Sequence, residues 1–201
     1  YGGTRILIYY GKPSPFSRAQ EVYFDFLPVR DYLDSGIWTF RLTPERKLEP
    51  AWLQTPECGA ETAAWLEAAR REGRFLLDVN DPPGSEATAR YAERHGLTTE
   101  DLRLRISGQL GRLMRRLLDG GLDATLLCTG GDTRLALMRA VGTAELTPVG
   151  ELAPGAVLTA FSYRGKSYSI ISKSGGFGEP DLFCRLARTL GAGNQKEEIV
   201  C

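Results

Sequence analysis

Short apolar runs and helical patterns alternate along the chain. Strand-like combinations of apolar, aromatic and β-branched residues predict β-strands at 5–10, 37–42, 74–79, 124–128, 144–152, 156–163 and 167–172. Arg164-Gly165-Lys166 predicts a hairpin turn between the last two strands. Helical spacing and capping residues predict helices at 17–27, 57–71, 85–94, 99–119, 133–141 and 179–190.

The longest predicted helix, 99–119, carries the clearest local signals. Thr98 can cap it, with Asp101 three residues later as in a capping box. Its apolar stripe comprises Leu102, Ile106, Leu110, Leu113, Met114 and Leu117. Gly108 and Gly111 each cost roughly 1 kcal/mol relative to Ala inside a helix. We therefore expect this helix to pack closely against a neighbour at both glycines.

The alternation of strands and helices predicts an α/β fold. We expect a mainly parallel sheet with helices on both faces, because parallel strands need crossover connections. The strand-rich stretch 144–172 predicts an antiparallel portion near the C-terminus. No internal repeat or long linker divides the chain, so we expect one domain over residues 1–191 and a polar tail over 192–201.

Charge and composition exclude several classes of protein. The 201 residues include 25 Lys plus Arg and 25 Asp plus Glu, which argues against a nucleic-acid binder with a bulk basic field and against a polybasic membrane contact. No apolar run approaches the roughly 20 residues of a membrane-spanning helix. The chain starts at Tyr1, without Met, and we expect machinery upstream to be missing.

The number and spacing of the cysteines predict the cellular compartment of the protein. Cys58, Cys128, Cys184 and Cys201 form no CxxC pair, and the chain has a single histidine, so zinc-ligand spacing is absent. Scattered thiols are typical of a reducing compartment, which predicts free structural cysteines and a cytoplasmic protein.

A glycine-rich loop after the last predicted strand is the sharpest candidate for chemistry. Lys173 ends the strand, and the segment that follows holds Gly175, Gly176, Phe177 and Gly178. Glycines allow the backbone to approach a ligand closely, and successive N–H groups ahead of a helix bind anions. Lys173 stands where a cation could meet phosphate oxygens. The loop is neither a Walker A motif nor GxGxxG, and an ordinary tight turn remains an equal alternative.

A second glycine turn, Gly130-Gly131-Asp132-Thr133, follows the buried strand 124–128. The two glycines could let a ligand lie against the backbone. Thr133 would offer a hydroxyl to a phosphate or a metal-bound water, and Asp132 could hold Mg²⁺ through water. The alternative for either side chain is a simple helix cap.

The loop after the first strand, residues 11–20, is a weaker signal alone, because Ser-Pro turns are common. Its place after a strand puts it at the same sheet edge as the other two loops. In α/β sheets ligands bind at the carboxyl ends of the strands, so three glycine-bearing loops at one edge favour a binding site.

Together the three loops resemble the C-terminal, nucleotide-binding domain of the four-carbon acid sugar kinase family. The family pattern places Gly-Ser-x-Ser-x-x-Thr-x-x-Gln after a first strand, Gly-Gly-Glu-Thr after a later one, and Lys-Ser-Gly-(Gly/Asn)-Phe-Gly after the last. Matching positions are Gly11, Ser14, Ser17 and Gln20 for the first, Gly130 to Thr133 for the second, and Lys173 to Gly178 for the third. The sequence departs from the pattern at Lys12, where the family has Ser, and at Asp132, where it has Glu.

The resemblance implies ATP- and Mg²⁺-dependent phosphorylation of a short sugar acid such as a threonate or erythronate. It implies that the nucleotide is held by Ser14, Gly130, Gly131, Asp132, Thr133, Lys173, Gly175, Gly176, Phe177 and Gly178. The family's N-terminal domain, which is expected to bind the sugar acid and supply the catalytic base, is absent from this chain. We therefore assign no catalytic residue and expect the isolated chain to be inactive.

Two other classes of function remain open. The chain could be a non-catalytic module that binds a nucleotide or phosphometabolite, since nothing in it clearly supplies a general base. It could also be a structural interaction domain, which would make the three loops coincidental. The expected partners are a nucleotide, a sugar acid held by the missing domain and possible further copies of the chain, with no nucleic acid and no membrane.

Overall fold

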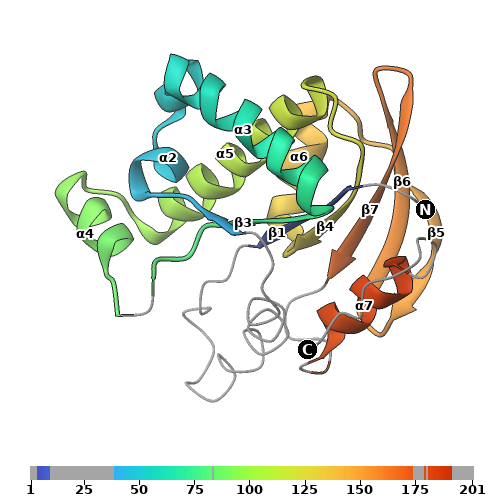
Figure 1. The fold of residues 1–201 in the computed structure, drawn as a ribbon. Coiled ribbons are helices and arrows are strands. Elements are labelled where there is room, and N and C mark those ends of the chain that lie inside the picture. The colour runs from blue at the N-terminus through green and yellow to red at the C-terminus, as the bar shows by residue number, and fades with distance from the viewer. Residues whose placement is uncertain (1–3, 10–38, 83, 174–178, 180, 192–201) are drawn as a thin grey trace.

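The computed structural model describes residues 4–9, 39–82, 84–173, 179 and 181–191 (Figure 1). Seven strands in these residues form one sheet in the order β2-β3-β1-β4-β7-β6-β5. Their bounds are β1 Thr4–Tyr9, β2 Thr39–Arg41, β3 Arg74–Asp78, β4 Ala124–Thr129, β5 Thr147–Ala153, β6 Ala156–Tyr163 and β7 Lys166–Lys173.

The sheet is parallel from β2 to β7 and antiparallel beyond it. This arrangement confirms the predicted mainly parallel sheet with an antiparallel portion near the C-terminus. The predicted hairpin joins β6 to β7 through Arg164 and Gly165, whose φ angles of 49° and 76° are those of a two-residue hairpin turn. The strand predicted to start at 144 begins three residues later, at Thr147.

Seven helical elements lie in the described residues. Their bounds are α2 Pro44–Leu48, the 3₁₀ helix η1 Pro50–Gln54, α3 Pro56–Glu72, α4 Ala87–Arg94, α5 Thr99–Asp119, α6 Gly131–Val141 and α7 Leu182–Gly191. The sequence pattern did not predict α2 or η1, which are short and begin at prolines. The helix predicted at 17–27 lies outside the described residues.

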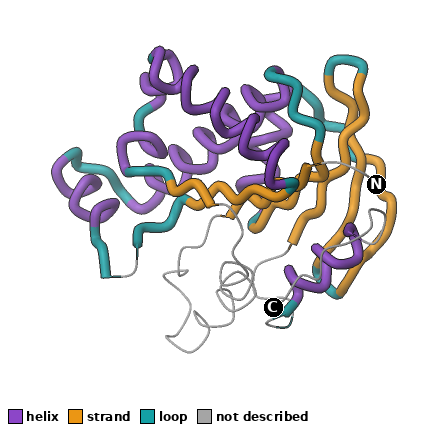
Figure 2. Tube along the Cα trace, in the orientation of Figure 1, coloured by secondary structure: helices purple, strands orange, loops and turns teal. Residues whose placement is uncertain are grey.

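Helices cover both faces of the sheet (Figure 2). Each face has its own apolar core. The larger core joins the strands to the helices from α2 to α6, whereas the smaller one packs α7 against the other face. Adjacent residues of β7 illustrate the division: Ile170 belongs to the larger core and Ile171 to the smaller, and both are fully buried. A strand buried on both faces needs apolar residues at consecutive positions, which explains the unbroken apolar runs in the sequence.

The predicted capping box at the start of α5 is confirmed. The Thr98 hydroxyl accepts a hydrogen bond from the Asp101 N–H, and the Asp101 carboxylate accepts one from the Thr98 N–H. The expected close packing is found at Gly111, where a Cβ would lie 2.5 Å from the Ala136 carbonyl oxygen of α6. At Gly108 the expectation is wrong, because a Cβ there would meet only the Arg112 guanidinium, at 3.8 Å.

Cys58 and Cys128 are free and buried, as expected. Cys184 departs from the expectation because it is disulfide-bonded, and sequence spacing does not report which thiols the fold brings together. No helix among the described residues is long and apolar enough to span a membrane.

Candidate functional site

The carboxyl ends of β1, β4 and β7 lie at one edge of the sheet, because these neighbouring strands are parallel. In the register of the sheet, Ile8 of β1 lies opposite Cys128 of β4, and Thr129 of β4 lies opposite Lys173 of β7. The backbone N–H of Gly130 donates a hydrogen bond of 3.2 Å to the Lys173 carbonyl oxygen. The second and third loops are therefore joined where they leave the sheet.

The Gly130-Gly131 turn leaves room in front of the backbone. Gly130 has φ +90° and ψ 137°, a backbone conformation that residues with a Cβ rarely adopt. A Cβ at either glycine would meet no atom of the described residues within 4 Å. Gly131 is the first residue of α6, so the free N–H groups and positive end of this helix face the open side of the turn. The turn has the geometry of a site for an anion.

Thr133 is buried, with 1% of its surface exposed, and its hydroxyl has no hydrogen-bond partner within the described part of the chain. Neither Thr133 nor Asp132 caps α6, since the helix begins before both and its cap position, Gly130, has no side chain. An unpaired buried hydroxyl costs free energy, and most such groups in proteins have a partner. The Thr133 hydroxyl is thus available to a ligand at the turn.

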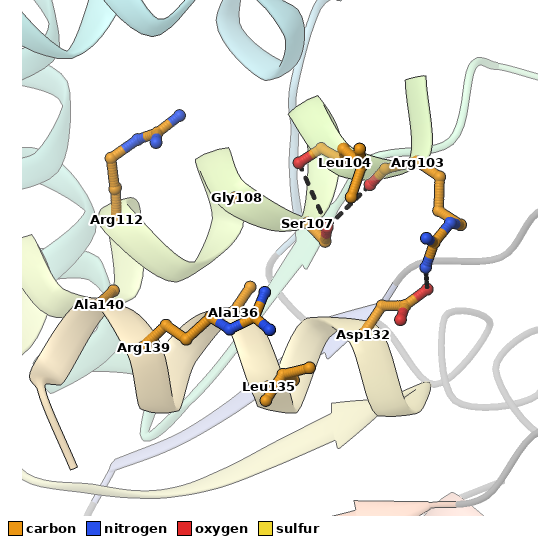
Figure 3. Close-up of a pocket in the computed structure, with 10 residues that line it drawn as sticks. All are labelled: Arg103, Leu104, Ser107, Gly108, Arg112, Asp132, Leu135, Ala136, Arg139 and Ala140. Atoms are coloured by element: carbon orange, nitrogen blue, oxygen red, sulfur yellow. Dashed lines mark hydrogen bonds and ion pairs between the residues drawn. The ribbon is translucent and has the colours of Figure 1, made fainter. Parts of the chain in front are cut away.

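Asp132 is tied to α5. Its carboxylate accepts a hydrogen bond of 2.5 Å from Arg103 (Figure 3). Arg103 also donates to Glu100. The hydrogen bonds with Glu100 and Asp132 raise the pKa of the Arg103 guanidinium above its usual range. Asp132 therefore points along the groove between α5 and α6 rather than standing free at the turn.

That groove is an open cavity of about 480 Å³ beside the candidate site. Residues of both helices line it: Arg103, Leu104, Ser107, Gly108, Arg112, Asp132, Leu135, Ala136, Arg139 and Ala140. Figure 3 shows Gly108 on the groove wall, which explains why it makes no close helix contact.

Lys173 is the last residue of β7 and is buried, with 4% of its surface exposed. It pairs in the sheet with Thr129 on one side and Ala156 on the other. The preceding residue, Ser172, carries a buried hydroxyl oxygen to which no described residue forms a hydrogen bond. The edge of the sheet thus holds a buried cation and two unpaired hydroxyls, those of Thr133 and Ser172.

The other predicted site residues cannot be compared with this geometry. Ser14, Gly175, Gly176, Phe177 and Gly178 lie outside the described residues. Among the described residues, no group of three or more His, Cys, Asp or Glu side chains could hold a metal ion.

The sequence analysis missed a polar cluster at the end of β3, on the same sheet edge. Asp78 is buried, and its carboxylate accepts a hydrogen bond from Nε of Arg41 and forms an ion pair with Nη2 of the same residue, both at 2.8 Å. Lys47, with 1% of its surface exposed, donates to the Val79 carbonyl and to the Asp81 carboxylate, at 2.6 Å and 2.9 Å. The only signal was the run Asp78 to Asp81, which is also typical of a strand-ending turn.

The same cluster shows how burial and hydrogen bonding compete. Burial opposes ionisation of Asp81, but hydrogen bonds from the Thr88 side chain and backbone and from Lys47 outweigh it and lower the pKa of the carboxyl group. Each charged side chain of this cluster is paired with another polar group of the described residues. We therefore interpret the cluster as structural, since it holds the loop after β3 in place.

Comparison with known proteins decides the family. The family model of the nucleotide-binding C-terminal domain matches residues 29–183. The chain belongs to this family. The match spans the Gly130 turn and the loop after Lys173, and it confirms the resemblance to the C-terminal domain of four-carbon acid sugar kinases.

Individual relatives agree with this assignment. A 3-oxo-tetronate kinase from Cupriavidus necator is 28% identical over 157 residues, which cover 77% of this chain and 34% of that enzyme. A Haemophilus influenzae protein with a DUF1537 domain has the same fold, with a TM-score of 0.64 and 18% identity over 94% of this chain and 40% of that one. A Bordetella bronchiseptica DUF1537 protein, solved as a domain-swapped dimer with bound citrate, gives a TM-score of 0.60 at 18% identity over 94% of this chain and 39% of that one. The chain therefore spans about a third of the length of the curated relative and about two fifths of the solved structures.

Proposed function

We propose that this nucleotide-binding domain binds ATP as part of a kinase that phosphorylates a four-carbon sugar acid of the threonate or erythronate type. The observation that carries the proposal is the turn at Gly130, which is open in front of its backbone, lies at a helix start and is bonded to the end of β7. The named activity of the Cupriavidus necator relative supports the sugar-acid class.

The described residues fit a nucleotide phosphate chain. The N–H groups at the start of α6 and the unpaired hydroxyl of Thr133 would donate to phosphate oxygens, and Lys173 would supply positive charge near them. In the proposed site Ser14, Gly175, Gly176, Phe177 and Gly178 complete the contacts to the nucleotide. Phosphoryl transfer depends mainly on positioning and charge stabilisation, which are the contributions this domain would make.

Fewer of the described residues are suited to contact Mg²⁺ than to contact the phosphates. Asp132 is the carboxylate at this turn, and one of its oxygens is held by Arg103. Mg²⁺ keeps several waters and is usually bound by one or two carboxylates together with substrate phosphates. We therefore assign to Asp132 a contact to Mg²⁺ through water.

The sugar acid and the general base would come from an N-terminal domain, since the chain spans about a third of its curated relative. Kinase activity should accordingly appear only when this chain is mixed with a separately produced N-terminal domain. Activity of the isolated chain with threonate or erythronate would contradict this division of roles.

Thermal unfolding with Mg-ATP, Mg-ADP and inorganic phosphate tests nucleotide binding directly. A ligand at a hundred times its Kd stabilises the folded state by about 2.7 kcal/mol, which corresponds to about 5–10 °C for a domain of this size. We expect a shift with both nucleotides and none with phosphate alone. Absence of a shift at millimolar nucleotide would contradict the proposal for the isolated chain.

The alternative is a non-catalytic module that binds a nucleotide or phosphometabolite. Nucleotide binding without kinase activity, both alone and after mixing, would favour it. We further propose a cytoplasmic location and self-association, the latter because the Bordetella bronchiseptica relative is a domain-swapped dimer.

A further inference from the structure

Arg134 is a charged residue on the first turn of α6 that the family pattern does not include. It is half-buried, and its guanidinium has no hydrogen-bond or ion-pair partner among the described residues. The apolar stem of an arginine can account for its buried part, and the five N–H donors of the guanidinium are then open to a ligand that supplies acceptor oxygens.

The helix geometry directs this side chain toward the edge of the sheet. Met138 and Val141, four and seven residues further on, are buried with 6% and 9% of their surface exposed, so Arg134 lies on the side of α6 that faces the protein. The groove toward α5 is lined by other positions of the helix, such as Asp132 and Leu135. Side chains in a helix lean toward its N-terminus, which here is the turn at Gly130.

The charge of Arg134 reaches the end of β4. Burial raises the pKa of the Cys128 thiol to about 12, and the positive charge of Arg134 acts in the opposite direction. Cys128 lies directly opposite Ser172 in the sheet. Arg134 is on the protein-facing side of the first turn of α6, which follows β4 directly, so its side chain lies toward the carboxyl ends of β4 and β7.

Two hydroxyls at the carboxyl ends of β4 and β7 also indicate a ligand site, and they do so independently of Arg134. The Thr133 hydroxyl, on a residue with 1% of its surface exposed, has no hydrogen-bond partner among the described residues, and neither does the buried hydroxyl oxygen of Ser172. One ligand with several acceptor oxygens would satisfy both hydroxyls and the guanidinium. A phosphate chain has such oxygens, and it also matches the fork of arginine donors.

We infer that Arg134, together with the hydroxyls of Thr133 and Ser172, binds the phosphate chain of the nucleotide. The inference rests on the proposed function and adds a cationic contact that the resemblance to the sugar acid kinases does not assign. The contact is to phosphate, so it distinguishes nucleotides from nucleosides.

Calorimetric titration of the full 201-residue chain with Mg-ADP, Mg-ATP and adenosine tests this contact. Arg134→Gln should raise the Kd for both nucleotides at least about tenfold, because it removes a hydrogen bond to a charged group. The Kd for adenosine should stay the same. Arg134→Lys should recover part of the affinity, since it keeps the charge and loses the fork.

Arg139→Gln is the matched control, because Arg139 is on the same helix but is exposed and lines the groove toward α5. It should bind all three ligands as the wild type does. The melting temperature of Arg134→Gln without ligand should match that of the wild type. A large fall in that temperature, or failure to fold, would overturn the inference by showing that Arg134 holds the fold.

The wild type separates the inference from the proposed function. If the wild type binds neither nucleotide, the proposed function fails. If it binds them and Arg134→Gln binds them equally well, only the role of Arg134 fails.

Discussion

The backbone N–H of Gly130 donates a hydrogen bond to the carbonyl oxygen of Lys173, over 3.2 Å. This bond links two loops that lie more than forty positions apart in the chain. It extends the pairing of Thr129 with Lys173 by one residue beyond the sheet. The loops that follow β4 and β7 therefore start from backbone atoms that are joined by a hydrogen bond. This proximity is what allows both loops to contact the same ligand.

The two glycines of the turn should respond differently to substitution. Gly130→Ala places a Cβ on a residue with φ +90°, which should lower the free energy of unfolding by about 1–3 kcal/mol. Gly131→Ala has no such strain and lies at the first position of α6, so stability should be unchanged or slightly raised. Chemical denaturation measures both effects.

Gly131→Ala should nevertheless weaken nucleotide binding, because its methyl group occupies the open space in front of the turn. The melting-temperature shift with Mg-ATP should therefore shrink in this variant while its unliganded stability is kept. An unchanged shift would mean that the nucleotide does not lie against this glycine.

The unpaired hydroxyl of Thr133 should serve a ligand and not the fold. Thr133→Val removes it at nearly constant shape, so the free energy of unfolding should stay the same or rise. The Kd for Mg-ATP should increase about tenfold, as for the loss of one hydrogen bond to a charged group. Thr133→Ser keeps the hydroxyl and should bind as the wild type does. Equal affinity of the valine variant would argue against the contact.

The crossing of α5 and α6 offers a matched pair of variants. Gly111→Ala would place a Cβ 2.5 Å from the Ala136 carbonyl oxygen, and the helices would have to separate. We expect a loss of about 1–3 kcal/mol in the free energy of unfolding. Gly108→Ala meets only the Arg112 side chain, so it should raise stability by up to about 1 kcal/mol through helix propensity. Equal effects at both positions would contradict the packing described here.

The buried pair of Lys47 and Asp81 should make stability depend on pH. Asp81→Asn leaves the ammonium group of Lys47 buried without a charged partner, which should cost on the order of 3 kcal/mol at neutral pH. Asp123→Asn is the control: its pair with Lys166 is exposed, so the loss should stay below about 1 kcal/mol.

The sign of the pH effect follows from the lowered pKa of Asp81. A carboxyl group whose pKa is lower in the folded state stabilises the protein above its unfolded value of about 3.9 and loses that contribution as the pH falls below it. The stability difference between wild type and Asp81→Asn should thus narrow as the pH falls below about 5 and onward through the lowered pKa of the folded state. A constant difference across this range would show that the charge of Asp81 is not involved.

Much of the fold could be predicted because each signal was local. The capping box at Thr98 and the apolar runs of the strands depend on neighbours a few residues away, and they gave element bounds within about three residues. The missed elements α2 and η1 are short, and tertiary contacts hold them: Gln109 of α5 donates to the carbonyl oxygens of Arg46 and Glu49. Local pattern cannot report such contacts.

In the candidate site, too, residue types with a local role could be predicted, whereas contacts between distant residues could not. The sequence identified the glycines at 130 and 131 because positive φ and close approach require that residue type. It predicted that Asp132 holds Mg²⁺ through water, but it did not predict that the carboxylate also pairs with Arg103 from the preceding helix. It did not single out Arg134 or Ser172, because their significance depends on which groups surround them.

The sequence by itself determined the order of strands and helices, the glycine turns and the family, since these follow from residue types at short spacing. Only the tertiary structure decided which loops lie next to each other and which polar groups are left without a hydrogen-bond partner among the described residues. Gly130 bonds to Lys173 and Asp132 to Arg103, whereas the Thr133 hydroxyl bonds to none of the described residues, because strand register and helix crossing decide which distant residues meet. Hydrogen bonds form only at a separation of about 3 Å, and the sequence does not contain that distance.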